Sequence, residues 1–327
     1  MSDNNATVRF HFFDFIFTPH KGNESMEDSN RILKECIQKI NDERTQKQKA
    51  IVIDRHEGRK DVESRNIFIS SVAFLAKEKK FKCRIALIRD NKIPTLVNKS
   101  TYSLTPFDEL GDNSIAETTN FYIDVNGPVP VVCCEFNSQG PRISDIEYYF
   151  RYISSNKMLY ISKACKASMH MKLPVNEVLD SITDVLKFKI KAKPNRLSYL
   201  YQEIADPFIT NMNALANTIK PNSIRVDAFF RERGNLDVKT PKNIQAVSFI
   251  KRVLNAVKND NEVIEDFEDF YLEFEKEDGS DEIFNLVRGK QEIIISCSYR
   301  TPGNLDTKEL YDNTTMAFDT YLSNRNN

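Results

Sequence analysis

The chain has 327 residues, of which 40% are hydrophobic and 28% are charged, and its formal net charge is -1. This composition is typical of a folded protein and excludes an intrinsically disordered one, and the length favours two domains of ordinary size. A net charge near zero excludes attraction to DNA or to an anionic membrane through bulk charge, so either would need locally segregated charge.

The N-terminal segment, MSDNNATVRFHFF, lacks the basic region, apolar run and small-residue cleavage site of a secretory signal. No stretch reaches the roughly 20 apolar residues that span a bilayer. We therefore expect a cytoplasmic protein with reduced, structural cysteines. No two cysteines form a CxxC pair, which argues against a zinc site. The cysteines are Cys36, Cys83, Cys133, Cys134, Cys165 and Cys297.

The first half of the chain is rich in predicted strands. Residues 7–17 form an aromatic strand pattern, and residues 25–40 carry apolar side chains at helical spacing behind a capping sequence, SMED. Four more segments predict strands, namely AIVIDRHEG, NIFISSVAFLA, KCRIALIRD and IPTLVNK. The segment NFYIDVNGPVPVVCCEFN predicts a hairpin, and residues 144–155 predict a helix.

After about Asn156 the pattern changes. A predicted helix precedes a strand with alternate lysines, and the helical stretch LSYLYQEIADPFITNMNALANTI should bend at Pro207. A strand, an amphipathic helix, two late strands and a closing helix follow. Strands and helices mix without regular βαβ repetition, which predicts an α+β fold. We expect a strand-rich N-terminal domain at residues 1–160 and a mixed domain at residues 161–327.

The segment KFKIKAKPNR, residues 187–196, has a lysine at every second position up to the proline. Because strand side chains alternate between two faces, the four lysines should share one face, while Phe188, Ile190 and Ala192 face the core. A row of like charges favours a polyanionic partner, since phosphate contacts supply most nonspecific affinity for nucleic acid. Lysines on an edge strand also prevent edge-to-edge aggregation, and the sequence leaves this alternative open.

Further basic residues extend this candidate surface. The predicted DNA-contact residues are Lys187, Lys189, Lys191, Lys193, Arg196, Arg225, Arg231 and Arg233. Residues 262–282 are strongly acidic, so the near-neutral net charge predicts a basic face with the acidic residues lying away from the lysines. As an alternative, the acidic segment is itself the functional surface, and the protein is an interaction module for a basic partner.

A metal-dependent nuclease is a second alternative. The sequence has no glycine-rich phosphate loop and no GxSxG elbow, and we expect no cofactor. Asp54, His56 and Glu57, however, follow a predicted strand. The two carboxylates could share a hard cation, with His56 or Lys60 assisting proton transfer.

Asp124 and Glu135 form the second nuclease candidate. They lie on the two strands of the predicted hairpin, like the carboxylates of nucleases of the PD-(D/E)xK type, in which a metal generates the attacking hydroxide. Asn137 occupies the position at which those enzymes carry lysine. The sequence leaves a catalytic role for either group open.

Three segments in consistent order resemble the Rex exclusion protein A family of phage lambda. They are FYIDVNGPVPVVCCEFNSQGPRISDIEYYF, VLKFKIKAKPNRLSYLYQEIAD and TPGNLDTKELYDNTTMAFDTYL. The resemblance implies a cytoplasmic, dimeric DNA-binding sensor of phage exclusion that acts with a small membrane-embedded partner. It also implies that residues 187–196 match the basic strand of that family. The sequence is equally compatible with a Kiwa-type defence component, a kind of protein that likewise binds DNA beside a membrane partner.

From the lysine pattern and this resemblance, we expect a protein that binds double-stranded DNA without catalysis and largely independently of sequence. Its setting would be phage exclusion, a form of abortive infection. A homodimer could provide a positively charged cleft that spans the duplex.

Overall fold

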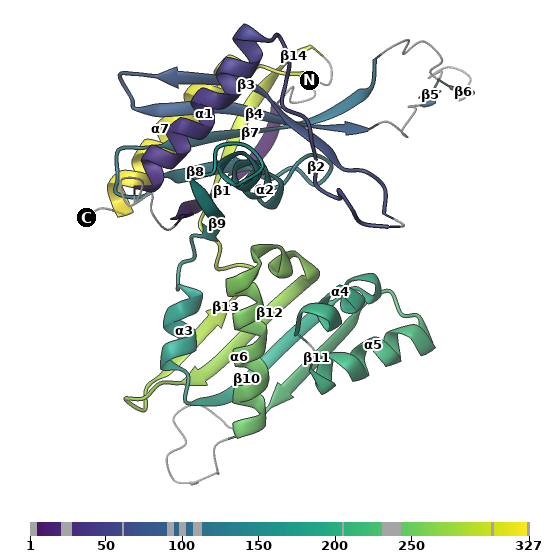
Figure 1. Ribbon diagram of the computed structural model, residues 1–327. Coiled ribbons are helices and arrows are strands. Elements are labelled where there is room, and N and C mark those ends of the chain that lie inside the picture. The colour runs from purple at the N-terminus through teal and green to yellow at the C-terminus, as the bar shows by residue number, and fades with distance from the viewer. Residues whose placement is uncertain are drawn as a thin grey trace. The chain divides into compact units, whose positions relative to one another are not determined.

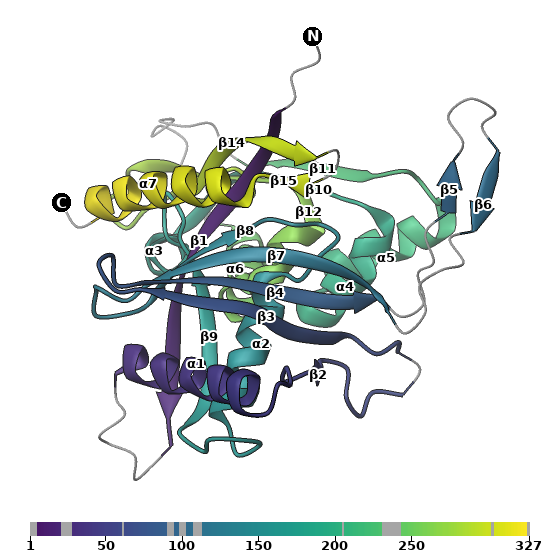
Figure 2. The same cartoon turned by 90° about the horizontal axis from the view of Figure 1, so that it is seen from above.

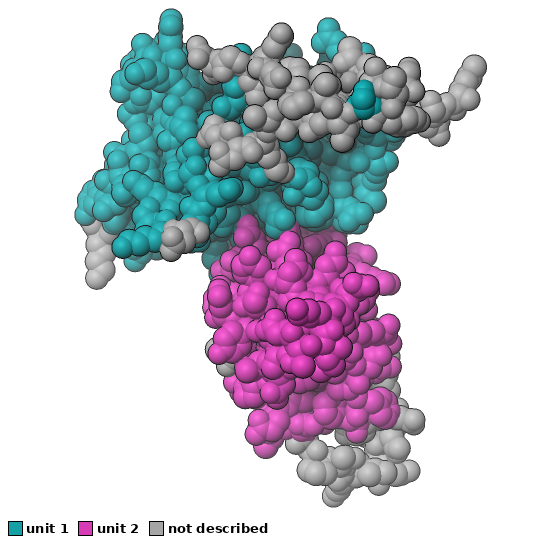
Figure 3. Space-filling view, turned by 90° about the vertical axis from the view of Figure 1, so that its right-hand side faces the viewer, with its two compact units in different colours: residues 1–167, 292–327 teal, residues 168–291 magenta. Residues whose placement is uncertain are grey.

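The computed structural model describes residues 5–20, 28–60, 62–89, 95–97, 103–106, 113–204, 206–230, 243–301 and 304–325. Both helices and strands are extensive, and the fold is α+β, as the sequence predicts. The chain forms two compact units, which Figure 3 shows in different colours. Unit 1 comprises residues 1–167 and 292–327, and unit 2 comprises residues 168–291.

Unit 1 contains a nine-stranded sheet in the order β15-β14-β1-β8-β7-β4-β3-β2, with β9 pairing with β1 off this path. A separate two-stranded sheet is formed by β5 and β6. The strands are β1 (Asn5–Pro19), β2 (Ile53–Asp54), β3 (Asn66–Leu75), β4 (Lys80–Arg89), β5 (Thr95–Val97), β6 (Leu104–Pro106), β7 (Ile115–Asp124), β8 (Val131–Glu135), β9 (Ser162–Met169), β14 (Glu292–Thr301) and β15 (Asn304–Leu305). The helices are α1 (Ser29–Gln46), α2 (Ile143–Ser154) and α7 (Thr307–Arg325).

The aromatic strand β1 lies inside this sheet and is covered on both faces. Figure 2 shows α7 on one face of the sheet, with α1 and α2 on the other. Phe10 and Phe12 pack with Phe318 of α7, and Phe15 makes an edge-to-face contact with Phe150 of α2. A strand buried on both faces needs apolar residues at successive positions, which explains the aromatic density of this segment.

The division into units differs from the single boundary expected near residue 160. Residues 292–327 return to unit 1, because β14 pairs antiparallel with β1, with Asn5 opposite Ser298 and His11 opposite Glu292. Leu310 and Phe318 of α7 then enter the core beneath this pair of strands. Strand pairing between the two ends of the chain is nonlocal, so the local sequence pattern does not reveal it.

Unit 2 contains a four-stranded sheet in the order β11-β10-β12-β13, in which all pairs are antiparallel (Figure 1). Its core joins one face of this sheet to apolar residues of α4, α5 and α6. The strands are β10 (Asp184–Ala192), β11 (Ile224–Phe229), β12 (Phe267–Glu275) and β13 (Asp281–Asn285). The helices are α3 (Val175–Ser181), α4 (Pro194–Ile204), α5 (Pro207–Ile219) and α6 (Ile244–Asn259), followed by the 3-10 helix η2 (Asn261–Asp266).

Local signals determine several helix ends. Asp28 caps α1, because its side chain accepts a hydrogen bond from the backbone N–H of Asn30 at 2.8 Å. The bend expected at Pro207 is a break between two helices, with Asp206 capping α5 and Pro207 in its first turn. Among the described residues, no helix is long and apolar enough to cross a membrane.

Candidate nucleic-acid interface

The alternate lysines share one face of β10, as the sequence predicts. Phe188, Ile190 and Ala192 are almost fully buried, whereas Lys187, Lys189 and Lys191 are half-buried. Phe188 packs against Phe208 of α5 and Phe249 of α6, so the apolar side of the strand forms the core of unit 2. None of the described helices of unit 2 is packed on the lysine side. Lys193 lies just beyond the last residue of the strand.

The strand that carries the lysines is an internal strand, not an edge strand. It pairs with β11 on one side, where Lys187 is opposite Phe229, and with β12 on the other, where Lys187 is opposite Glu273. Protection of a free sheet edge therefore does not explain the lysines, because both sets of backbone groups are already paired. The same pairing places Arg225 of β11 opposite Lys191 and on the same face of the sheet.

The acidic residues are not separated from the lysines, and this expectation is wrong. Residues 262–282 form η2, β12 and the first part of β13, and β12 is the direct neighbour of the lysine strand. Asp269 is opposite Lys191, and Glu273 is opposite Lys187. The antiparallel register thus brings positive and negative side chains to adjacent strands of one face. At least the β12 part of the acidic segment therefore belongs to the lysine face.

Ion pairs partly neutralise four of the predicted contact residues. The carboxylate of Glu268 forms ion pairs with Lys191 at 2.8 Å and with Lys193 at 3.7 Å. The hydrogen bond from Lys191 lowers the pKa of Glu268. Arg196 lies 3.4 Å from Asp266, and Arg225 lies 3.3 Å from Asp227. These ion pairs reduce the positive charge that this end of the sheet offers to a ligand.

Lys187 and Lys189 lie at the other end of the row. Within the described part of the chain, neither ammonium group forms an ion pair. The Nζ of Lys189 lies 5.6 Å from the ring centroid of Tyr271, which is opposite it on β12. The side chain of Phe229, opposite Lys187 on β11, is 61% exposed. This end of the row therefore combines two aromatic rings with two lysines that form no ion pair with the residues described.

Sequence reasoning missed both aromatic residues. In the segment IRVDAFF, strand alternation places Val226, Ala228 and Phe230 against the core, so Phe229 points to the lysine face. That alternation was available from the sequence, but the position of β11 beside β10 was not. Two predicted contact residues, Arg231 and Arg233, lie outside the described residues.

The structure does not bring Asp124 and Glu135 together. Asp124 lies opposite Val131 at one end of the β7–β8 pair. Glu135 lies at the other end, where one carboxylate oxygen accepts hydrogen bonds from the backbone N–H and side-chain amide of Asn120, at 2.9 and 2.7 Å. Burial raises the pKa of Glu135, against the opposing effect of these hydrogen bonds.

Asn137, which stands at the lysine position of the nuclease pattern, shapes the loop after β8. Its side-chain oxygen accepts hydrogen bonds from the backbone N–H groups of Gln139 and Gly140, both at 3.0 Å. A Cβ at Gly140 would lie 2.6 Å from the Asn137 amide and 2.8 Å from the Thr119 hydroxyl. A larger residue at position 140 would therefore displace these side chains from the loop.

Asp54, His56 and Glu57 have structural contacts in a turn. The carboxylate of Asp54 accepts hydrogen bonds from the backbone N–H groups of His56 and Arg65, both at 2.8 Å. Glu57 is turned to the surface and lies 3.8 Å from Lys157. No group of three histidine, cysteine, aspartate or glutamate residues in the described ranges is arranged to hold a metal ion.

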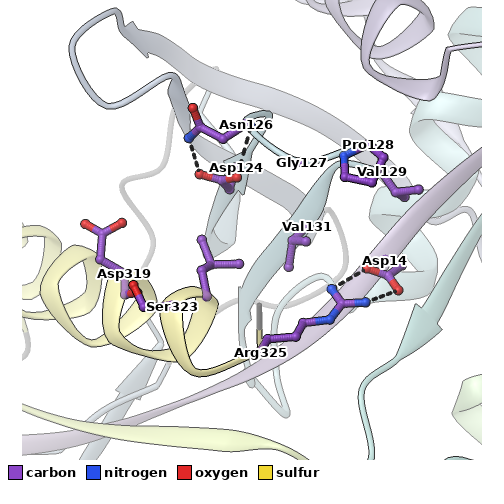
Figure 4. Close-up of a pocket in the computed structure, with 11 residues that line it drawn as sticks. Asp14, Asp124, Asn126, Gly127, Pro128, Val129, Val131, Asp319, Ser323 and Arg325 are labelled. Carbon is purple, nitrogen blue, oxygen red and sulfur yellow. Dashed lines mark hydrogen bonds and ion pairs between the residues drawn. The ribbon is translucent and has the colours of Figure 1, made fainter. Parts of the chain in front are cut away.

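Unit 1 also contains a polar pocket of about 390 Å³ beside the end of α7 (Figure 4). Arg325 donates two hydrogen bonds to Asp14, both at 2.9 Å, and Asn126 donates a 2.7 Å hydrogen bond to Asp124. Asp319 pairs with the buried Lys80 of β4. The pairs of Arg325 with Asp14 and of Asp319 with Lys80 connect the last turns of α7 to the sheet, so these charges stabilise the position of the helix.

No protein-family model matches this chain, and no curated protein matches it at a significant level.

Proposed function

We propose that the protein binds double-stranded DNA, largely independently of sequence, through the lysine face of unit 2. The single observation that carries the proposal is the pair of lysines, Lys187 and Lys189, that stand on an internal strand and form no ion pair with any of the residues the structure describes. Phosphate contacts of this kind supply affinity without reading bases. The neighbouring Lys191, Lys193 and Arg225 are secondary contacts.

The ion pairs on this face limit the affinity without preventing binding. Exposed ion pairs contribute only about 0–1 kcal/mol each, so phosphates can replace Glu268 and Asp227 as partners at small cost. Among the described residues, Lys187 and Lys189 have no such ion pair to break. We therefore expect them to contribute more to binding than Lys191 and Lys193, although the four residues are chemically identical.

Salt dependence tests the proposal. The double variant Lys187→Gln/Lys189→Gln should bind duplex DNA more weakly, and the slope of log affinity against log salt should become shallower by about 1.8, since each phosphate contact contributes about 0.9. Affinity is measured by fluorescence anisotropy across a salt series. The matched control is Lys258→Gln, which removes an exposed charge from the helical layer of unit 2. A salt slope unchanged by the double variant would refute the assignment.

We propose phage exclusion as the setting, with a homodimer and a small membrane-protein partner, on the resemblance of three segments to the Rex exclusion protein A family. Host cells that carry this gene with its neighbouring genes should plate a sensitive phage less efficiently than cells that carry the Lys187→Gln/Lys189→Gln variant. Equal plating by both strains, with equal protein levels, would contradict the role of DNA binding in exclusion.

A further inference from the structure

The lysine face of unit 2 also carries aromatic rings, which duplex binding does not explain. Phe229 is 61% exposed and stands opposite Lys187, and Tyr271 stands opposite Lys189. The two rings belong to different strands and lie on opposite sides of β10. The exposed ring of Phe229 thus places a large apolar surface beside charged side chains, where a ligand could contact both.

The fold does not need the ring of Phe229 for its core. The core-facing positions of this segment are Val226, Ala228 and Phe230, and Phe230 packs against Phe188 at a centroid distance of 5.9 Å. Strand alternation directs Phe229 to the other face. Tyr271 is held in place, since its hydroxyl donates a hydrogen bond to Glu273 and Lys189 lies over its ring.

We infer that this face also binds single-stranded DNA, with an unpaired base stacked on Phe229 and phosphates on Lys187 and Lys189. Open faces of four-stranded sheets that combine aromatic and basic side chains are a recurring platform for single strands, because every base has a π-face and the backbone is anionic. Bases within a duplex are already stacked, so Phe229 adds nothing to duplex affinity. This inference rests on the proposed contact of the lysines with nucleic acid.

A tryptophan at position 229 reports stacking directly. The sequence contains no tryptophan, so Phe229→Trp introduces the sole indole of the protein. Titration with a single-stranded oligothymidylate should quench its fluorescence, whereas a duplex of equal length should bind with little quenching. Quenching of equal depth by both ligands, or none with a single strand that anisotropy shows to be bound, would overturn the inference.

Two further substitutions measure the contribution of the ring. Phe229→Ala and Phe229→Leu should each weaken single-strand binding about 5- to 150-fold, the range expected for one stacked base, and should leave duplex affinity unchanged. The matched control is Ile283→Ala on β13, which removes another exposed apolar side chain (44% exposed) that has no π-face. Retention of full affinity by Phe229→Leu would contradict stacking.

The outcomes separate this inference from the proposed function. Lysine-dependent duplex binding without any effect of Phe229 on single strands would leave the proposed function standing and reject the stacking site. Lysine-dependent single-strand binding with quenching, but no duplex binding, would reject the duplex proposal and support the stacking site. Absence of binding to both ligands would reject both.

Discussion

Asp145 is a buried carboxylate of unit 1 that forms ion pairs with two arginines. It is fully buried in the first turn of α2 and accepts hydrogen bonds from Arg55 at 2.9 Å and from Arg65 at 2.9 and 2.6 Å. Burial alone would raise the pKa of Asp145, but the Arg65 hydrogen bonds and the charges of both arginines outweigh it and hold the pKa below its usual range. A buried charge of this kind is stable only while its partners remain.

The variant Asp145→Asn should lower the free energy of unfolding by about 3 kcal/mol, because it leaves two arginines without their counterion. Stability is measured by urea denaturation. Asp180→Asn, a change at an exposed position of α3, is the control and should cost less than about 0.5 kcal/mol. A loss no larger than that of the control would show that the arginines do not need the carboxylate.

The lowered pKa of Asp145 also determines the direction in which stability changes with pH. Because the folded pKa of Asp145 is lowered, its contribution to stability is complete above the unfolded value of about 3.9 and is lost as pH falls through the folded value. The free energy of unfolding of Asp145→Asn, measured by urea denaturation at a series of acid pH values, should therefore lack this part of the pH dependence.

Among the elements, the pairing of β10 with β12 has the greatest consequence for function. An isolated row of lysines would form a strongly positive strip, but the neighbouring strand places Glu273 opposite Lys187 and Asp269 opposite Lys191. Residues directly opposite each other on antiparallel strands have Cβ atoms about 5 Å apart, close enough for their charges to interact. If the lysines bind phosphate as proposed, the acidic residues of β12 should therefore reduce their affinity for it.

Removal of one such charge should strengthen DNA binding. Glu273→Gln deletes a negative charge beside Lys187 and should lower the Kd for duplex DNA roughly two- to fivefold at moderate salt, the Coulomb effect of one screened charge at this separation. Asp180→Asn changes the net charge of unit 2 equally and should leave the Kd unchanged. Binding that tightens equally in both variants would indicate a long-range effect of net charge and not a local effect on Lys187.

For the whole molecule, the main organising feature is the return of the C-terminal segment to unit 1. Strand β14 supplies one neighbour of β1, and α7 covers the core that contains Phe10, Phe12 and Cys133. Unit 2, which the chain forms between these two parts of unit 1, has its own core of apolar residues from sheet and helices. The stability of unit 1 should therefore depend on residues at both ends of the sequence.

A truncation after Gln291 tests this dependence. Loss of β14 and α7 should abolish the hydrogen-exchange protection of amides in β1, while amides of β10 and β12 in unit 2 keep theirs, because their core is complete without the C-terminal segment. Hydrogen-exchange mass spectrometry measures both regions in one experiment. A chain that ends at Arg325 is the control and should retain protection in both units. Full protection of β1 in the chain that ends at Gln291 would contradict the assignment of residues 292–327 to unit 1.

The sequence by itself determined the α+β class, most helices and strands, and the two-faced character of β10, because strand and helix periodicity are local properties. Only the tertiary structure decided which strands far apart in the sequence are neighbours. Glu273 is distant from Lys187 in the sequence, and Phe229 carries no local sign of its partner, yet sheet pairing places both directly opposite this lysine. Register between distant strands depends on the packing of a complete core. The candidate site was therefore predictable as a row of lysines, whereas its acidic neighbours and aromatic rings were not.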